Sequence, residues 1–219
     1  LFLRGILMSL SPKKINAQNL AETVIRNLSK RQIAGYYAQD KDEALEIACR
    51  FLQPGSSVSW GGSMTLNEIG LIDALKDSDC TVLDRTVPAP EDMAEFYGKV
   101  AACDYYFMST NAMTIDGQLV NIDGNGNRVA SLIHGPKNVI IIAGINKIVS
   151  DIPSAFKRAR DIAAPANTVR LNKNTPCTHV GHCCDCSSPD CICNQFVITR
   201  RSGIPDRIKV ILVGEELGY

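Results

Sequence analysis

The side chains that could do chemistry fall into a few short stretches, and the most unusual lies between residues 109 and 130. It is rich in Asn, Asp and Gly, and it ends in a lone arginine. Its polar candidates for ligand contact are Asn111, Asn121, Asp123, Gly124, Gly126, Asn127 and Arg128. Such a segment offers bends and short polar side chains. Because a guanidinium suits bidentate contact with a carboxylate or phosphate, we expect the stretch to face an anionic ligand. The alternative is a surface hairpin that carries polar side chains and does not face a ligand.

A Gly-Gly-Ser turn is the second candidate. Gly61, Gly62 and Ser63 follow an expected strand, and we expect a helix to begin at Thr65. The free N–H groups of that first turn, with the two hydroxyls, would form an anion pocket. A tight strand-to-helix turn is the alternative. Glu68 is structural if it reaches back to cap the helix, and it is suited to acid–base work if it turns outward.

The third candidate follows the most apolar segment of the chain, residues 138–144. Asn146 and Lys147 come directly after it, at the expected carboxyl end of a central strand. We therefore include both among the ligand-binding candidates, with a solvated loop lysine as the alternative. The three histidines do not form a Ser-His-Asp order or an HExxH helix, so hydrolase templates have no support.

Six of the nine cysteines fall in one short loop. Cys183 and Cys186 form a C-x-x-C pair, which commonly holds one metal ion, and Cys177 and Cys193 could complete four ligands. Zinc and an iron–sulfur cluster both accept four thiolates, and the spacing matches neither a zinc ribbon nor a ferredoxin run. A reduced, metal-free loop, or one disulfide formed during handling, is the alternative.

Helical and strand patterns alternate along the chain and must position these residues. We expect helices over residues 16–30, 40–52, 65–75, 91–102 and 151–163. We expect strands at 36–37, 56–60, 81–83, 105–109 and 138–144, an inserted hairpin turning at Asp116-Gly117, and a closing strand pair at 195–199 and 208–213. This alternation predicts an α/β fold with a mainly parallel sheet and helices on both faces. Ligands bind such sheets at the carboxyl ends of the strands.

Composition excludes some classes of protein. The 219 residues fit one large domain, and 23 basic against 23 acidic residues give no net charge. A general nucleic-acid binder needs a basic surface, so that class is disfavoured, although a locally basic face stays open. No apolar run approaches the ~20 residues of a membrane span. The apolar opening lacks a charged n-region and a small-residue cleavage site, so it is a poor candidate for a signal peptide, and we expect a cytoplasmic protein. Met8 could be an internal start, which would make residues 1–7 an upstream extension.

Several of these motifs together resemble a known family. They are residues 61–70, 117–130, 135–136, 144–149 and 160–167, with Thr175-Pro176-Cys177, Cys193-Asn194 and the final Glu216-Leu217-Gly218-Tyr219. The chain resembles the LUD-domain family, the lactate-utilisation proteins formerly grouped as a domain of unknown function. The resemblance implies a fold like those of sugar-phosphate isomerases and CoA transferases. It implies a single domain over residues 12–219, with a Cys-rich loop at 176–194, after an extension at 1–11.

The resemblance also implies a role in bacterial L-lactate use, beside iron–sulfur partner subunits that oxidise lactate to pyruvate. The chain is similar to the small subunit that lacks tandem ferredoxin motifs, and the resemblance supplies no catalytic residue. Cys184 and Cys191 are additions to the family's simpler cysteine pattern. Three hypotheses stay open: a subunit of a lactate-oxidising complex, a stand-alone enzyme or binding protein for a small phosphorylated, nucleotide or CoA-linked ligand, and a metal or redox module.

Overall fold

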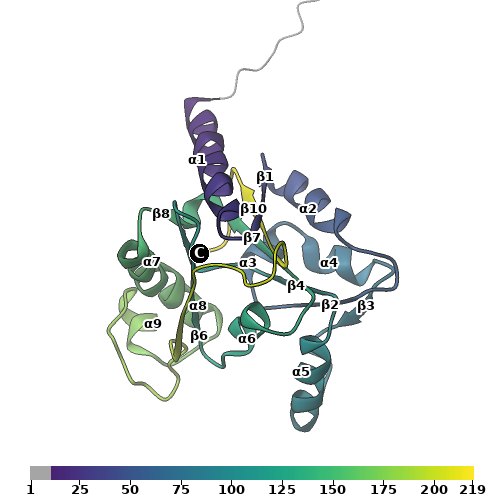
Figure 1. Cartoon of the computed structure of the whole chain (residues 1–219). Helices are drawn as coiled ribbons and strands as arrows, with labels where there is room; N and C mark the ends of the chain where they lie inside the picture. The colour runs from purple at the N-terminus through teal and green to yellow at the C-terminus, as the bar shows by residue number, and fades with distance from the viewer. Residues whose placement is uncertain (1–10) are drawn as a thin grey trace, which may run out of the picture.

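The computed structural model describes residues 11–219, and a six-stranded parallel sheet lies at its centre (Figure 1). The strand order is β1-β10-β7-β4-β2-β3. The strands are β1 (Ala34–Ala38), β2 (Ser57–Trp60), β3 (Thr81–Leu83), β4 (Tyr105–Met108), β7 (Asn138–Gly144) and β10 (Ile208–Val213). Strands β7 and β10 are almost wholly buried because both of their faces are apolar, as expected at the centre of a covered parallel sheet.

Helices cover both faces of this sheet, as the alternating pattern predicts. Helices α1 (Pro12–Ser29), α5 (Met93–Ala101) and α6 (Asn127–Ile133) pack on one face. Helices α2 (Lys41–Arg50), α3 (Met64–Glu68) and α4 (Leu71–Lys76) pack on the other. Neighbouring residues of β7 divide between the two cores, with Ile141 in the first and Ile142 in the second.

A second, smaller sheet of order β8-β5-β6-β9 stands beside the first. Its strands are β5 (Ala112–Thr114), β6 (Leu119–Asp123), β8 (Ile148–Val149) and β9 (Gln195–Thr199). Around it lie α7 (Ile152–Arg158), a π-helical turn (Ala159–Ala163), α8 (Ala164–Arg170) and α9 (Pro176–Val180), on the left of Figure 1. Short 3₁₀ helices occupy Pro90–Asp92 and Ile145–Lys147.

The two closing strands are confirmed at the predicted residues as β9 and β10, but their pairing with each other is wrong, because they lie in different sheets. Strand β10 is apolar on both faces and pairs in parallel with β1 and β7, whereas β9 alternates in exposure and pairs antiparallel with β6. The inserted hairpin is confirmed as β5 and β6. Its loop has three residues, one more than the expected Asp116-Gly117 turn, because Thr114 N donates to Gln118 O at 3.0 Å and Gly117 takes a positive φ of 86°.

Helix boundaries differ from the sequence prediction at three places. Helix α1 begins at Pro12 with Ser11 as its cap, since proline is favoured in a first turn. The helix expected from Thr65 begins at Met64 with Ser63 as its cap, and Gly70, at φ 72°, separates α3 from α4. The helix expected to end at residue 163 continues as α8 to Arg170.

Two further expectations concern the ends of the chain and the membrane. The predicted extension at residues 1–11 lies, apart from Ser11, outside the described residues. Between residues 11 and 219, every helix is too short or too polar to span a bilayer.

Candidate functional site

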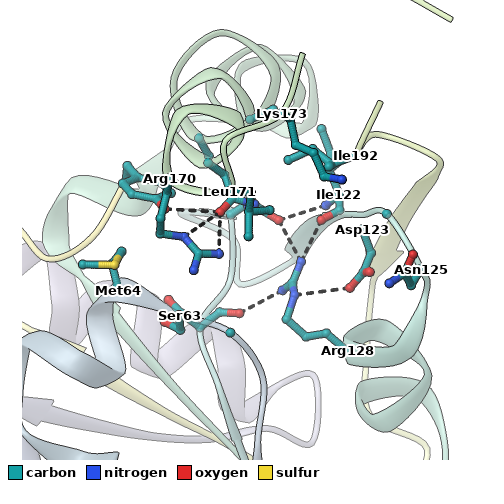
Figure 2. A pocket seen from close by; sticks show the side chains of 18 of the residues that line it. Ser63, Met64, Ile122, Asp123, Asn125, Arg128, Arg170, Leu171, Lys173 and Ile192 are labelled. Carbon is teal, nitrogen blue, oxygen red and sulfur yellow. Dashed lines mark hydrogen bonds and ion pairs between the residues drawn. The ribbon is translucent and has the colours of Figure 1, made fainter. Parts of the chain in front are cut away.

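A cleft of about 460 Å³ lies where the carboxyl ends of β2, β4 and β7 meet the second sheet (Figure 2). This is the edge at which open parallel sheets bind ligands, and the volume suits a small organic molecule. The cleft brings together nine of the predicted ligand-binding residues: Gly62, Ser63, Thr65, Asn111, Asp123, Gly124, Asn127, Arg128 and Lys147. Residues more than 80 positions apart in the sequence therefore share one cavity.

Five predicted residues do not line the cleft. Gly61 instead allows close packing, because a Cβ there would lie 3.1 Å from the Arg128 side chain. Asn146 bonds the backbone of the C-terminal segment, since its Oδ1 accepts from Leu217 N at 3.2 Å. Gly126 takes a positive φ of 80° at the start of α6. The other two, Asn121 and Glu68, support neighbouring residues as described below.

Lys147 lies at the base of the cleft, directly after β7. Its side chain is buried, with 3% of its surface exposed, and it still lines the cavity. Its Nζ donates to Thr65 Oγ1 at 3.1 Å and to Ser109 Oγ at 3.0 Å. Among the described residues, no carboxylate forms an ion pair with it. Burial, and then the positive charges of Arg158 and Arg128, lower the pKa of Lys147 to about 7.

The protonation state of Lys147 decides whether its amine can attract an anion or accept a proton. With a pKa near 7, the amine is present in both protonation states at neutral pH. The charged form attracts an anion, and the neutral form accepts a proton. An anionic ligand beside the amine would favour the charged form, since an opposite charge stabilises it.

Arg128 organises the loop around it rather than offering free donors. Its Nη1 donates to Ser109 O at 3.0 Å and to Asn121 Oδ1 at 2.6 Å. Its Nη2 donates to Asn111 Oδ1 and to the carbonyl of residue 122, and its Nε lies 3.3 Å from Asp123 Oδ2 (Figure 2). A guanidinium has five N–H donors, so all of them have protein partners. Arg128 thus shapes the wall of the cleft and leaves no donor for a ligand.

Glu68 and the short helix α3 also differ from their predicted roles. Glu68 Oε2 accepts from the backbone N of Gly218 at 2.7 Å, so it holds the C-terminal segment and does not cap α3. Ser63 Oγ accepts from Leu66 N at 3.4 Å, which places the cap two residues before the predicted start. Helix α3 has five residues, so its macrodipole is small. Positive charge in the cleft therefore comes from its cationic side chains rather than from this helix.

The six clustered cysteines line a second cavity of about 70 Å³, next to the cleft. All are free thiols. Burial, and then the neighbouring Cys191 thiol, raise the pKa of Cys193 to about 12. Within residues 11–219, no group of three or more His, Cys, Asp or Glu side chains is placed to hold a metal ion. The predicted zinc or iron–sulfur site at Cys177, Cys183, Cys186 and Cys193 is therefore not confirmed.

The LUD domain family model matches residues 21–213, which is most of the chain. The chain belongs to the LUD domain family. A crystal structure of a DUF162 family protein from Deinococcus radiodurans is similar in fold, with a TM-score of 0.52 and 13% identity. That likeness covers 91% of this chain and 98% of the other. No curated protein is significantly similar in sequence.

Other solved structures resemble parts of this LUD domain. D-ribose-5-phosphate isomerase, in complex with phospho-erythronic acid, has a TM-score of 0.36 and 18% identity over 60% of this chain and 64% of its own. The delta subunit of eIF2B from Chaetomium thermophilum has a TM-score of 0.33 and 21% identity over 48% and 46%. Likenesses this partial carry no argument about function.

Sequence reasoning missed several residues of the LUD-domain cleft, above all three cations. Arg85, Arg170 and Lys173 line it together with Arg128 and Lys147, and the acidic side chains that line it are Asp123 and Asp190. In Figure 2 the side chains of Arg170 and Lys173 lie across the pocket from Ser63. Arg170 was missed because the helix before it was expected to end at residue 163, whereas α8 continues to Arg170. Arg85 follows a three-residue strand and carries no local motif.

Proposed function

We propose that this LUD-domain protein binds a small organic anion, a carboxylate or a phosphate ester, in the cleft, with Lys147 beside its reacting atoms. The observation that carries the proposal is a buried amine that lines the cleft without a carboxylate partner among the described residues. Burying an ammonium without a counter-ion is costly, so such a group signals a site that a ligand completes.

Charges around the cleft support the same ligand class. Asp123 is paired with Arg128, and Asp190 lies 3.6 Å from Lys173. Arg85, Lys147 and Arg170 have no carboxylate in an ion pair within residues 11–219, so the cleft carries surplus positive charge. Thr65 and Ser109 hold the amine through their hydroxyls, which leaves one of its donor positions for a ligand.

The family resemblance narrows the proposal to L-lactate utilisation. Lactate and pyruvate are small carboxylates, and the neutral form of Lys147 could accept the proton of a bound hydroxyl group. Oxidation would also require an acceptor for the two electrons, and the resemblance assigns that part to iron–sulfur partner subunits. The chain would then supply the anion-binding part of such a complex.

A stand-alone enzyme or binding protein for a phosphorylated, nucleotide or CoA-linked ligand is the second candidate. The size of the cleft favours it, because about 460 Å³ is more than lactate fills. Several cations without an ion-pair partner in the described part of the chain also suit a ligand that carries more than one negative charge.

Calorimetric titration tests the proposal with L-lactate, pyruvate, a sugar phosphate, a nucleotide and CoA. We expect at least one anion to bind, with an affinity that falls as the pH rises above 7, because the cationic form of Lys147 is lost. Lys147→Met should abolish both the binding and its pH dependence. Lys157→Met is the matched control, since Lys157 is exposed and outside the cleft. Absence of binding by every anion tested, or equal binding by the Lys147 variant, would contradict the proposal.

A further inference from the structure

The second cavity gathers side chains that the proposed function does not use. Six thiols line it, together with the side chains of Arg160, Thr168, Thr175 and Phe196: Cys177, Cys183, Cys184, Cys186, Cys191 and Cys193. They come from α9 and from the irregular segment before β9. Cys177 is buried, and its Sγ lies 3.1 Å from Thr175 Oγ1 and 3.6 Å from Thr168 Oγ1. Cys184 is exposed, whereas Cys183 and Cys186 are half-buried.

Cys183 differs from the other thiols because a cation contacts its sulfur. Arg160 Nε donates to Cys183 Sγ at 3.3 Å, and the backbone N of Asp185 donates to the same sulfur at 3.5 Å. The other end of the guanidinium is fixed, since Arg160 Nη2 lies 2.6 Å from Asp185 Oδ1. Two N–H donors, one of them from a cationic side chain, are therefore directed at the sulfur of Cys183, and this geometry singles it out as the candidate attacking thiol.

The backbone between Cys183 and Cys186 turns back on itself. Asp185 has a φ of 50°, in the left-handed region that Asp tolerates better than most residues. This turn places both ends of the C-x-x-C pair on one cavity. C-x-x-C pairs are a common framework for reversible dithiol–disulfide chemistry.

We propose that this cysteine pocket is a redox site, in which Cys183 attacks a hydroperoxide and Cys186 forms a disulfide with it. In the first step, the Cys183 sulfur attacks the terminal peroxide oxygen, the O–O bond breaks, and an alcohol or water leaves. Cys183 is then a sulfenic acid. In the second step the Cys186 thiol attacks this sulfur, the S–S bond forms, and the hydroxyl group leaves with the thiol proton as water. Two thiols supply the two electrons that the peroxide takes up.

Arg160 serves as a positioning residue in this chemistry. It contacts the attacking sulfur and holds the turn at Asp185, and it takes no part in bond making. Its contribution should therefore appear in the rate of peroxide attack and not in the number of thiols finally oxidised.

Peroxide titration of the full chain, purified reduced and under anaerobic conditions, tests the proposal by counting alkylatable thiols and by intact mass. We expect the wild type and the control Cys184→Ser to lose two thiols per chain at stoichiometric hydrogen peroxide. Cys186→Ser should accumulate a sulfenic acid that dimedone captures. Cys183→Ser should react at least about tenfold more slowly, since it lacks the sulfur that attacks the peroxide.

Arg160→Gln keeps all six thiols, so it tests the proposal even if a cysteine variant fails to fold. It should slow the loss of the two thiols without changing their final number. The proposal is overturned if Cys183→Ser or Arg160→Gln reacts as fast as the wild type. It is also overturned if elemental analysis finds stoichiometric zinc or iron whose removal by a chelator is needed before any thiol reacts. Such a result would make the pocket a metal site.

Discussion

Replacing Arg128 by methionine tests whether this arginine organises the cleft or binds its ligand. The substitution keeps much of the aliphatic stem and removes five donors, four of which bond Asn121, Asn111 and two backbone carbonyls. It also leaves Asp123, which is 8% exposed in its side chain, without its cation. Breaking a buried ion pair costs about 3–5 kcal/mol. Because the bonds belong to one network and their energies do not add, we expect a loss of about 3–5 kcal/mol in the free energy of unfolding.

The loss is large against a total stability of about 5–15 kcal/mol, and it corresponds to a decrease of roughly 6–20 °C in Tm for a chain of this size. Urea unfolding can follow it through the fluorescence of Trp60, the single tryptophan, which is buried in β2. Arg85→Met is the matched control, since Arg85 is exposed and also lines the cleft. It should change stability by less than about 0.5 kcal/mol and weaken anion binding. If the two variants were equally stable, the argument that Arg128 holds the loop would be wrong.

Three further predictions concern stability. Lys147 loses its proton near pH 7 when folded and near pH 10.4 when unfolded, so between these values the unfolded chain binds more protons and stability should rise with pH. Urea unfolding at pH 7, 8 and 9 should show this rise in the wild type and a smaller one in Lys147→Met; identical slopes would contradict the assigned pKa. Gly126→Ala should cost about 1–2 kcal/mol because of its positive φ, whereas Gly98→Ala, on the exposed face of α5, should stabilise by about 0.5–1 kcal/mol; thermal unfolding should give opposite signs. Glu68→Gln weakens the acceptor for Gly218 N, so amide hydrogen exchange should accelerate at that residue, and unchanged exchange would argue against the tether.

Much of the main sheet could be predicted because its signals are local. The apolar run of β7 and the capping aspartate before α2 need no distant partner to be recognised. The placement of β9 could not be predicted in this way. Its partner is β6, which precedes it by more than 70 residues. The short segment QFVIT contains no local signal that identifies the sheet to which it belongs.

The candidate site could be predicted in part, for a related reason. Residue types and turn chemistry located the segments around Ser63, Asp123 and Lys147, which do meet at one cleft. The roles within the segments depend on geometry that the sequence does not contain. Arg128 has an ideal side chain for ligand binding, and the fold instead uses all of its donors internally. Lys147 has an ordinary loop context, and only burial makes its amine unusual.

Cys191 and Ile192 line both the cleft and the cysteine pocket. The same segment is fixed to the cleft turn, because Asn194 N donates to Asp123 O and its Nδ2 donates to Gly124 O, each at 3.1 Å. If formation of a disulfide moved this shared segment, the redox equilibrium of the pocket and the binding equilibrium of the cleft would be linked. Such linkage is reciprocal. If a disulfide changes the affinity of the cleft for an anion by some factor, the bound anion changes the thiol–disulfide equilibrium constant by the same factor. Metabolite concentration and oxidation state would then act on this domain as a single combined signal.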